Sequence, residues 1–507
     1  MGSAHDVLSA SIADVVVYSS TAFISWLTIW VIYQSFFHPL SQYPGPVAAK
    51  LSDAYNGFHV LTGNLHLTAL RNQLKYGPAV KHGPNKLLFN SITAIRDIYK
   101  SGGTTKPKAY IALRPGLNTQ TTITAIDPHI HRPRRQSVGQ VISERFMRRF
   151  EPIMVNQVAL YIQEVFGTTQ ESRPVNVSDS MRRLGLNIAG LLAFAYDLGI
   201  QTRDENSLML PMLDAGGLWS AVFLHWPNAR RFRLGLVTIQ AFRQLRGRYL
   251  SIVEIMIKTR SAQDTDAKQD LYSILAPALD IGTEGIRQNE LWAEANLFLL
   301  AAGGTTKTAL SATFFYLSRN PGAYYKLARE IQSAFQSASD INGQTLGGCH
   351  YLRACIDEAL RLSPPGPGTI VGVNIYAIHH NPEYFEDPFE FIPERWIDDT
   401  MSGERRKTMR DAFIPFLVGS RGCAGKSMAY LEISLVIAKT LWYFDFGPAS
   451  GELGQVGAGR VGLGYGRERA GEFQPYDHFT ASHDGPYLNF EHRDTCQELS
   501  AKYSARN

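Results

Sequence analysis

The segment from Phe416 to Gly425, FLVGSRGCAG, carries the side chains with the clearest chemical potential in this chain. Its pattern is F-x-x-G-x-R-x-C-x-G, in which Gly419 and Gly425 lie on either side of Cys423. Glycine permits close approach of other atoms and unusual backbone dihedrals, so the pattern predicts an exposed sulfur on a tight loop. A thiolate that binds haem iron needs such a loop, because the porphyrin must be able to cover it.

Two neighbouring features favour the thiolate form of Cys423. Arg421 would offset the negative charge of a haem propionate, and its field would stabilise the thiolate. Gly425 opens a predicted helix, KSMAYLEISLVIAKTLWYF, whose N-terminus places backbone N–H groups near the sulfur. A buried structural cysteine in a glycine-rich turn is the alternative. It is disfavoured because five positions of the ten-residue segment fit the pattern.

This loop resembles the cysteine loop of the cytochrome P450 superfamily, and two more motifs agree with that. Glu358 and Arg361 resemble its ExxR pair, and Arg395 in PERW resembles the later arginine of an ionic triad. The i,i+3 spacing of the pair places both side chains on one helix face. The resemblance implies that the triad is structural and supports the region behind the haem. Phrases such as KYGPAVKHGPN and YDHFTASHDGPYLNF resemble filamentous-fungal members, many of which act in secondary metabolism, including mycotoxin formation.

A basic segment, His131-Arg-Pro-Arg-Arg135, resembles the haem-propionate helix of the family. His131 and Arg135 are the two residues that match its spacing. The alternative is an exposed basic cluster. Pro133 is tolerated in a first helical turn, so we expect the helix to begin near it.

The longest predicted helix runs from about Thr283 to Asn320 and contains the glycine pair Gly303 and Gly304. Two glycines inside a helix cost about 1 kcal/mol each, which indicates a ligand close to the backbone, a kink or a plain helix crossing. The segment AAGGT, which ends at Thr305, resembles the family motif A-G-x-[DE]-T, with Gly304 in place of the acid. In the family, the hydroxyl and the acid relay protons during oxygen activation. In this chain, Thr305, Thr306, water or the substrate would have to relay these protons. We therefore expect slower turnover or more peroxide leakage than in a Gly304→Glu variant.

A second departure lies between Arg361 and Arg395. About 20 residues, enough for two strands and a turn, seem to be missing after Pro367. In the family this segment lines the pocket above the haem. Its loss would mean a reshaped open pocket, a damaged protein or an incorrectly joined coding sequence, and the well-matched flanks favour the last.

The N-terminal part contains an uncharged run of 23 residues, Val15 to Phe37. A helix of that length spans a bilayer of about 30 Å. A buried core helix and a cleaved signal peptide are alternatives. A signal peptide begins with basic residues, but no Lys or Arg precedes Lys50 in this chain. The later basic residues place the body in the cytosol by the positive-inside rule. We therefore expect an anchor segment (1–37), a proline-rich stiff hinge (38–50) and a haem-binding monooxygenase domain (51–507).

The rest of the chain reads as one large domain, mainly α with a small β portion. Helical periodicity is seen in Ile153 to Phe166, Met181 to Phe194, Leu234 to Lys258 and Ala323 to Phe335, and a short strand is expected from Thr369 to Tyr376.

The chain has 507 residues, 4 cysteines and a net charge of +5, which argue against a disulfide scaffold and give no reason to expect nucleic acid. Gly457 to Gly462 fits G-x-G-x-x-G, but no strand and helix flank it.

The resemblance implies haem b with Cys423 as its thiolate ligand and metal-binding residue, and an apolar small molecule as substrate. Too few residues follow Cys423 for a fused flavin domain, so NADPH would act through a separate P450 reductase, with cytochrome b5 as a further candidate partner. The basic residues between Arg405 and Arg410 would suit such docking, and a solvated loop is an equal alternative. The implied location is the endoplasmic reticulum membrane, single-pass. A haem-binding or haem-less pseudoenzyme is the competing hypothesis.

Overall fold

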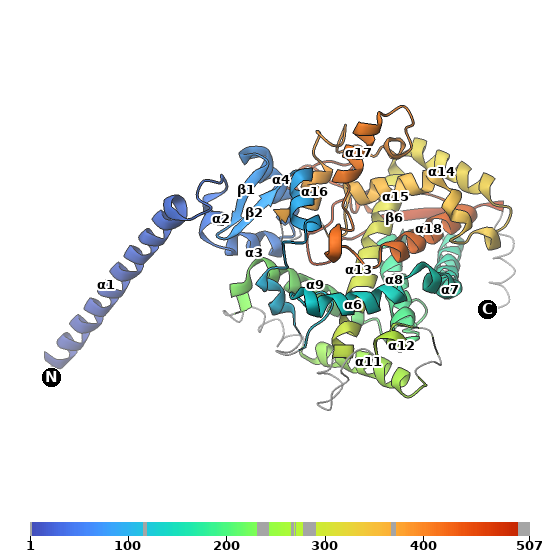
Figure 1. The fold of residues 1–507 in the computed structure, drawn as a ribbon. Helices are drawn as coiled ribbons and strands as arrows, with labels where there is room; N and C mark the ends of the chain where they lie inside the picture. Colours follow the sequence, from blue (N-terminus) through green and yellow to red (C-terminus); the bar gives the residue numbers. More distant parts are fainter. Residues whose placement is uncertain are drawn as a thin grey trace.

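The computed structural model describes residues 3–114, 119–230, 243–264, 268, 270–276, 290–366 and 372–494, with side chains from residue 12 onward. Helices form most of the body, and α1 projects from it (Figure 1). The longer helices are α1 Ser3–Ile32, α3 Ala54–Leu61, α4 Leu65–Tyr76, α6 Pro128–Val141, α7 Glu144–Gln170, α8 Val177–Phe194, α9 Met209–His225, α11 Arg243–Ser261, α13 Glu290–Arg319, α14 Pro321–Ala334, α15 His350–Leu362, α17 Gly403–Ala412 and α18 Lys426–Tyr443. The shorter ones are α2 Val47–Leu51, α5 Ile92–Ile95, α12 Leu271–Leu275 and α16 Ile375–His379.

Two small sheets flank the helical body. The first has the order β1-β2-β4, in which β1 and β2 are antiparallel and β2 and β4 are parallel. The second has the order β3-β6-β5 and is antiparallel throughout. The strands are β1 Ala79–Gly83, β2 Lys86–Phe89, β3 Val175–Asn176, β4 Gly372–Val373, β5 Phe444–Pro448 and β6 Tyr487–His492. A mainly α fold with a small β portion is thus confirmed.

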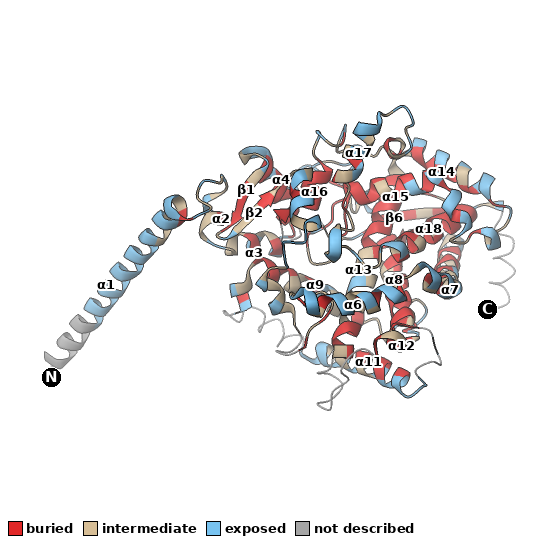
Figure 2. Cartoon of the chain, in the orientation of Figure 1, coloured by how far each residue is buried: buried red, intermediate tan, exposed pale blue. Residues whose placement is uncertain are grey.

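The main core lies between α7, α8, α13 and α18, whose apolar side chains form one buried cluster. Buried residues follow the inner faces of α8, α13, α15 and α18 (Figure 2). Leu184, Leu310 and Ile433 are fully buried members from three of these helices. Because α13 packs along α8 and crosses α18, the core fixes the position of its glycine pair relative to the cysteine loop.

Most of the predicted helices are confirmed, with some changes at their ends. The periodic segments in α7, α8 and α14 are helical, as is the part of Leu234 to Lys258 that lies in α11; residues 234–242 lie outside the described residues. The longest predicted helix corresponds to α13, and residues 283–289 lie outside the described residues. The strand prediction from Thr369 to Tyr376 is wrong at its end. Asn374 caps α16 by accepting a hydrogen bond from the N–H of Ala377, so the chain turns into a helix there.

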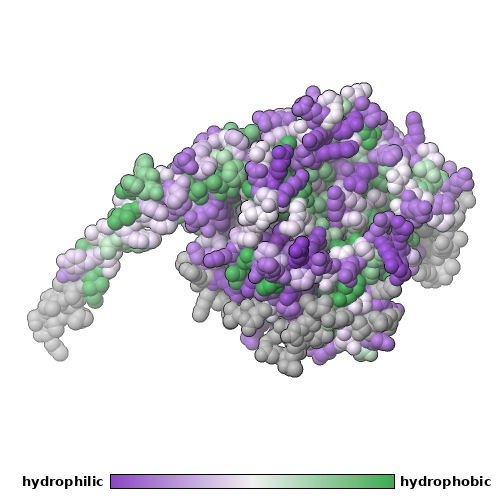
Figure 3. Space-filling view, in the orientation of Figure 1, coloured by the Kyte–Doolittle hydropathy of each residue, from purple (hydrophilic) through white to green (hydrophobic). Residues whose placement is uncertain are grey.

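The segment from Ile12 to Phe37 is long and apolar enough to cross a membrane, and none of its most apolar window is buried. Figure 3 shows apolar side chains along this projecting rod, in contrast to the largely hydrophilic face of the body. At its end, Gln34 and His38 contact the buried Lys81 of β1, whose Nζ lies 3.2 Å from Gln34 Oε1. The Lys81 N–H also donates to the Pro44 carbonyl at 2.8 Å. The segment after the anchor is therefore fastened to β1.

Candidate active site

The cysteine loop connects η10 (Gly419–Arg421) to α18 and turns tightly around Cys423. The backbone N–H of Cys423 donates to the Phe416 carbonyl at 2.7 Å, which closes the turn. Gly419 has a φ of +76°, and a Cβ there would overlap the Tyr99 carbonyl oxygen. Both observations require glycine at 419.

Gly425 has a different role from the one expected. Its φ of −81° is ordinary, so the unusual dihedral predicted there is wrong. A Cβ at Gly425 would meet no atom within 4 Å, and the Cys423 side chain next to it is exposed. The loop therefore presents its sulfur to open space, beside a residue without a side chain.

The groups that act on Cys423 differ in part from the prediction. Burial on its protein side raises the pKa of the thiol, while the Gly425 N–H, Arg135 and Lys426 act in the opposite direction. The Arg421 guanidinium donates to the carbonyls of Ala125 and Ile126 at 2.7 and 2.8 Å. The Gly425 N–H at the start of α18 acts on the thiol as predicted, and Arg135 and Lys426 are two further groups that favour the thiolate.

A cluster of basic side chains lies beside this loop: Lys106, His131, Arg135 and Arg421. Burial, then Arg421, lowers the pKa of Lys106 to about 7. Burial, then the three neighbouring cations, lowers the pKa of His131 to about 4. None of the charges that act on Lys106, His131 or Arg421 in the described structure belongs to a carboxylate. Such a cluster calls for an anion.

His131 and Arg135 reach this cluster from α6. Asp127 caps the helix by accepting a hydrogen bond from the His129 N–H at 2.8 Å, and Pro128 is its first residue. The expectation that the helix begins near Pro133 is therefore wrong. Pro133 lies inside α6 on its exposed face. Proline has no N–H to donate to the preceding turn, and the loss of that hydrogen bond costs least where water can reach the free carbonyl.

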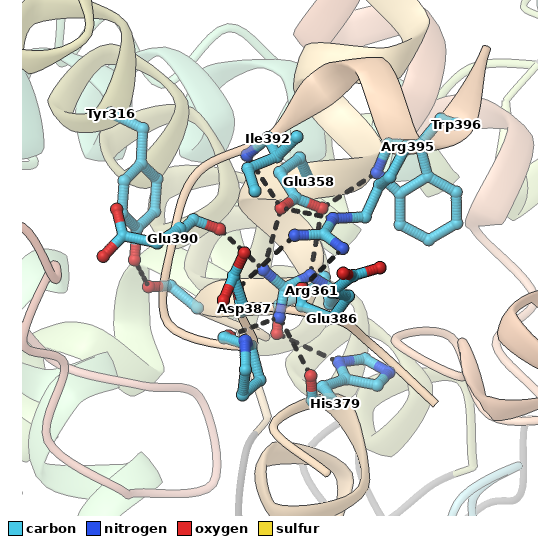
Figure 4. Close-up of polar contacts among 12 residues, drawn as sticks. Tyr316, Glu358, Arg361, His379, Glu386, Asp387, Glu390, Ile392, Arg395 and Trp396 are labelled. Atoms are coloured by element: carbon cyan, nitrogen blue, oxygen red, sulfur yellow. Dashed lines mark hydrogen bonds and ion pairs between the residues drawn. The ribbon is translucent and has the colours of Figure 1, made fainter. Parts of the chain in front are cut away.

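Glu358, Arg361 and Arg395 lie together and are fully or almost fully buried (Figure 4). Glu358 Oε1 lies 2.8 Å from Arg361 Nη2 and 3.0 Å from Arg395 Nε. Glu358 also accepts hydrogen bonds from the Trp396 indole at 2.9 Å and the Ile392 N–H at 3.0 Å. Burial alone would raise the pKa of Glu358, but Arg361 and Arg395 overcome this effect and lower it.

The remaining donors of both arginines bind backbone carbonyls of the segment before PERW. Arg361 donates to the carbonyls of His379, Pro388 and Glu390, and Arg395 donates to that of Glu386 at 2.8 Å. A buried ion pair is stabilising only when its other donors and acceptors are satisfied. This network meets that condition and ties α15 to the chain that leads to the cysteine loop.

On α13 the two candidate threonines face different surroundings. Thr305 is half-buried and donates to the Ala301 carbonyl at 2.7 Å. Thr306 is buried, donates to the Ala302 carbonyl at 2.8 Å, and faces Gly185 of α8 and the buried Glu432 of α18. Of the two, only Thr305 has a side chain that is not enclosed by the helical core.

The two glycines of α13 also differ. A Cβ at Gly303 would make ordinary contact with Leu186 of α8, so this position is the plain helix crossing. A Cβ at Gly304 would lie 2.8 Å from Thr480 Oγ1 and 2.9 Å from its Cβ. Thr480, from the loop before β6, therefore fills the space that a side chain at 304 would need.

A family model for cytochrome P450 matches residues 55–455 of the chain. The chain belongs to the cytochrome P450 family. It is 31% identical over 503 residues to the cytochrome P450 monooxygenase AKT7 of Alternaria alternata, with 92% of this chain and 96% of the relative covered. It is 32% identical over 539 residues to the monooxygenase apf7 of Gibberella fujikuroi, with 96% and 99% covered. The trichothecene C-15 hydroxylase of Fusarium sporotrichioides is 28% identical over 480 residues, with 88% and 94% covered.

Membership of the P450 family implies a haem-thiolate cofactor, and the residues present fit it. Cys423 is exposed on a tight loop, and Gly425 leaves open space where a flat ring system could approach the sulfur. Cationic groups without a carboxylate lie beside the loop, as the two haem propionates require.

Three residues of this region were missed by the sequence analysis. Lys106 lies outside every motif in the chain. Thr480 lies within the phrase YDHFTASHDGPYLNF, but nothing in that phrase predicts its contact with Gly304. Glu432 did carry a signal, because it is the only acid in the otherwise apolar LEISLVIA stretch of the P450 helix α18.

Proposed function

We propose that this P450 is an active haem-thiolate monooxygenase in which Cys423 is the axial ligand. The exposure of the Cys423 sulfur beside the open space at Gly425 carries this proposal. His131, Arg135, Arg421 and, in addition, Lys106 would bind the propionates. Phe416 and Gly419 shape the loop, and Glu358, Arg361 and Arg395 hold the segment behind it.

When bound, the haem would supply oxygen activation, which a thiolate ligand favours. The chain's own residues would do the rest. The Gly425 N–H, Arg135 and Lys426 stabilise negative charge on the Cys423 sulfur. The Thr305 hydroxyl, which donates to Ala301, is the candidate to hold and pass a proton above the cofactor.

The reaction would insert one oxygen atom into an apolar small molecule, with electrons from NADPH through a separate P450 reductase. Hydroxylation is the simplest outcome, and epoxidation, desaturation or ring formation belong to the same class. The fungal relatives support a role in secondary metabolism, because one of them is by name a trichothecene hydroxylase.

The apolar N-terminal helix supports a single-pass anchor in the endoplasmic reticulum membrane, with the body in the cytosol. The exposed basic residues of α17 would suit the acidic face of a reductase.

The carbon monoxide difference spectrum of the reduced full-length protein tests this function. We expect the red-shifted Soret band of a thiolate-ligated haem. Cys423→Ser should lose it, and Cys349→Ser, at a buried cysteine in the main core, should keep it. A band typical of histidine-ligated haem, or no haem in the wild type, would reject the proposal.

An impaired pseudoenzyme, or a mis-joined coding sequence of an active enzyme, is the second candidate. The alignment with apf7 extends over 539 positions but includes only 96% of this 507-residue chain, so the relative has residues without a counterpart here. We place the shortage after Pro367, next to the short β4; residues 367–371 lie outside the described residues. Sequencing the transcript between Ser363 and Asn374 tests this: an additional stretch would support mis-joining, and its absence would support a reshaped pocket.

A further inference from the structure

An aromatic pair joins the cysteine loop to the first turns of α18. The ring centroids of Phe416 and Tyr430 lie 5.2 Å apart, and the rings are inclined by 45°. This spacing is typical of attractive aromatic pairs. Lys426 lies one turn before Tyr430 on the same face of α18, and its Nζ is 5.9 Å from the centroid of the Phe416 ring. The Phe416 ring therefore packs on the first two turns of α18.

The main chain of Phe416 belongs to the turn that presents Cys423. The Phe416 carbonyl accepts a hydrogen bond from the Cys423 N–H at 2.7 Å, so a shift of Phe416 would move the backbone of Cys423. The next residue, Leu417, has a φ of +55°. This conformation is unfavourable for a residue with a side chain, and it persists only where the surroundings hold it. The turn thus depends on contacts such as that of Tyr430.

Tyr430 is itself fixed by a charged pair on α15. It is buried, and its hydroxyl donates to Asp357 Oδ1. The other oxygen of Asp357 lies 3.0 Å from Arg353 Nε, and the Arg353 guanidinium covers the Tyr430 ring at 3.5 Å from its centroid. Burial, then the negative charge of Asp357, raises the pKa of Tyr430, so the hydroxyl stays protonated and remains the donor.

These contacts form a continuous chain from α15 to the cysteine loop, through Arg353, Asp357, Tyr430, Phe416 and Cys423. We propose that Tyr430 is a positioning residue for the Cys423 thiolate, and that its hydrogen bond to Asp357 helps to set the reduction potential of the haem iron. Tyr430 acts through Phe416. This inference rests on the proposed haem-thiolate function.

The direction of the effect follows from the charge at the iron. Reduction adds one negative charge beside the thiolate, and an apolar surrounding disfavours that charge. If Tyr430 no longer held Phe416, the turn would loosen, and water would reach the protein side of the sulfur, where burial now raises the pKa of the thiol. Loss of the Tyr430 contacts should therefore raise the reduction potential.

The test is a spectroelectrochemical titration of the full-length holoenzyme and its Tyr430→Phe and Tyr430→Leu variants. Neither substitution changes a charge, so a shift reports the loop and its solvation rather than a distant charge. Tyr430→Phe keeps the ring and loses the hydrogen bond, and we expect it to favour the ferrous state by about threefold. Tyr430→Leu also loses the ring contact and should favour that state by about tenfold, which is about 59 mV for one electron.

Tyr324 provides a matched control. It is a buried tyrosine whose hydroxyl donates to Asp445 at 2.7 Å, and Asp445 also pairs with Arg493. The same Tyr–Asp–Arg arrangement therefore occurs between α14 and β5, outside the cysteine loop. Tyr324→Phe should keep the wild-type potential. The iron–sulfur stretching frequency from resonance Raman scattering is a second readout, and it should shift in Tyr430→Phe but not in Tyr324→Phe.

An unchanged or lower potential in Tyr430→Phe, with its thiolate Soret band intact, would overturn the role of Tyr430 while leaving the monooxygenase function in place. Equal shifts in Tyr430→Phe and Tyr324→Phe would also overturn it, because the effect would then be common to buried tyrosines. Absence of the thiolate band in the wild type would instead reject the proposed function, and this inference with it.

Discussion

Gly419 and Gly425 flank the same cysteine, yet an added methyl group would meet opposite surroundings at the two positions. At Gly419 it would overlap the Tyr99 carbonyl, on a backbone with a φ of +76°. We expect Gly419→Ala to lower the free energy of unfolding by at least ~2 kcal/mol, from backbone strain and overlap together. Urea denaturation of both variants measures this cost.

Gly425→Ala is the matched variant, because its Cβ would meet no protein atom within 4 Å. In the absence of haem, we expect Gly425→Ala and the wild type to have the same urea midpoint. Gly425→Ala should bind less haem, since the methyl group would occupy the space assigned to the porphyrin ring. If Gly425→Ala bound haem as fully as the wild type, the ring would have to lie elsewhere.

Lys307 gives a pH-dependent prediction with a definite sign. Burial lowers its pKa from 10.5 to about 8, so the unfolded chain binds this proton more tightly than the folded one. The free energy of unfolding should therefore rise as the pH increases from about 8 to about 10.5. Lys307→Met removes this rise and should be more stable at pH 7, by on the order of 3 kcal/mol.

Thermal unfolding of Lys307→Met at pH 7 and pH 9.5 checks this. Lys258→Met is the control, because that lysine is 64% exposed and pairs with Glu254 on the surface of α11. Equal pH dependence of the wild type and Lys307→Met would show that the ammonium group is well solvated.

The helix α15 depends on one carboxylate for its attachment to the segment before the cysteine loop. Removing one partner of a buried ionic network costs about 3–5 kcal/mol, so Glu358→Gln should lose most of the stability of the body. The exposed Glu144, which pairs with Arg148 on α7, is the control, and Glu144→Gln should leave the urea midpoint unchanged. If Glu358→Gln lost little free energy of unfolding, the hydrogen bonds from Arg361 and Arg395 to backbone carbonyls would be enough to attach α15 to this segment.

The elements near the site show what the sequence could predict. Contiguous patterns predicted the cysteine loop, the helix α18 and the threonines of α13, because their spacing is local. Contacts between distant segments could not be predicted in this way. Thr480 on Gly304 and Lys106 beside Arg421 both arise from tertiary packing. Likewise, Arg421 matches the motif, but its hydrogen bonds to the Ala125 and Ile126 carbonyls and the effect of Arg135 on the Cys423 thiol join segments that are far apart in the chain.

The molecule as a whole is a compact helical body with one projecting helix, and the two parts share a buried contact. The fold class and the long apolar N-terminal helix followed from composition and periodicity, but this contact did not, since Gln34 and Lys81 are 47 residues apart. Gln34 is only 2% exposed although it lies at the end of an otherwise exposed helix. The N-terminal segment therefore completes the packing around Lys81.

Two truncations separate these functions of the N-terminal segment. Removal of residues 1–32 takes away most of the apolar span and keeps Gln34, whereas removal of residues 1–37 also takes away Gln34. We expect both proteins to leave the membrane pellet to the same extent. Only the longer truncation should lower the Tm, because Lys81 then loses two acceptors on Gln34, which lie 3.2 and 3.4 Å from its Nζ.

Sedimentation with membranes and thermal unfolding measure the two effects independently. Lys81→Met in the longer truncation should recover the Tm, since it removes the buried charge that lost its partners. If the two truncations had the same Tm, Gln34 would contribute nothing to the body, and the end of the anchor would be joined to it by the chain alone.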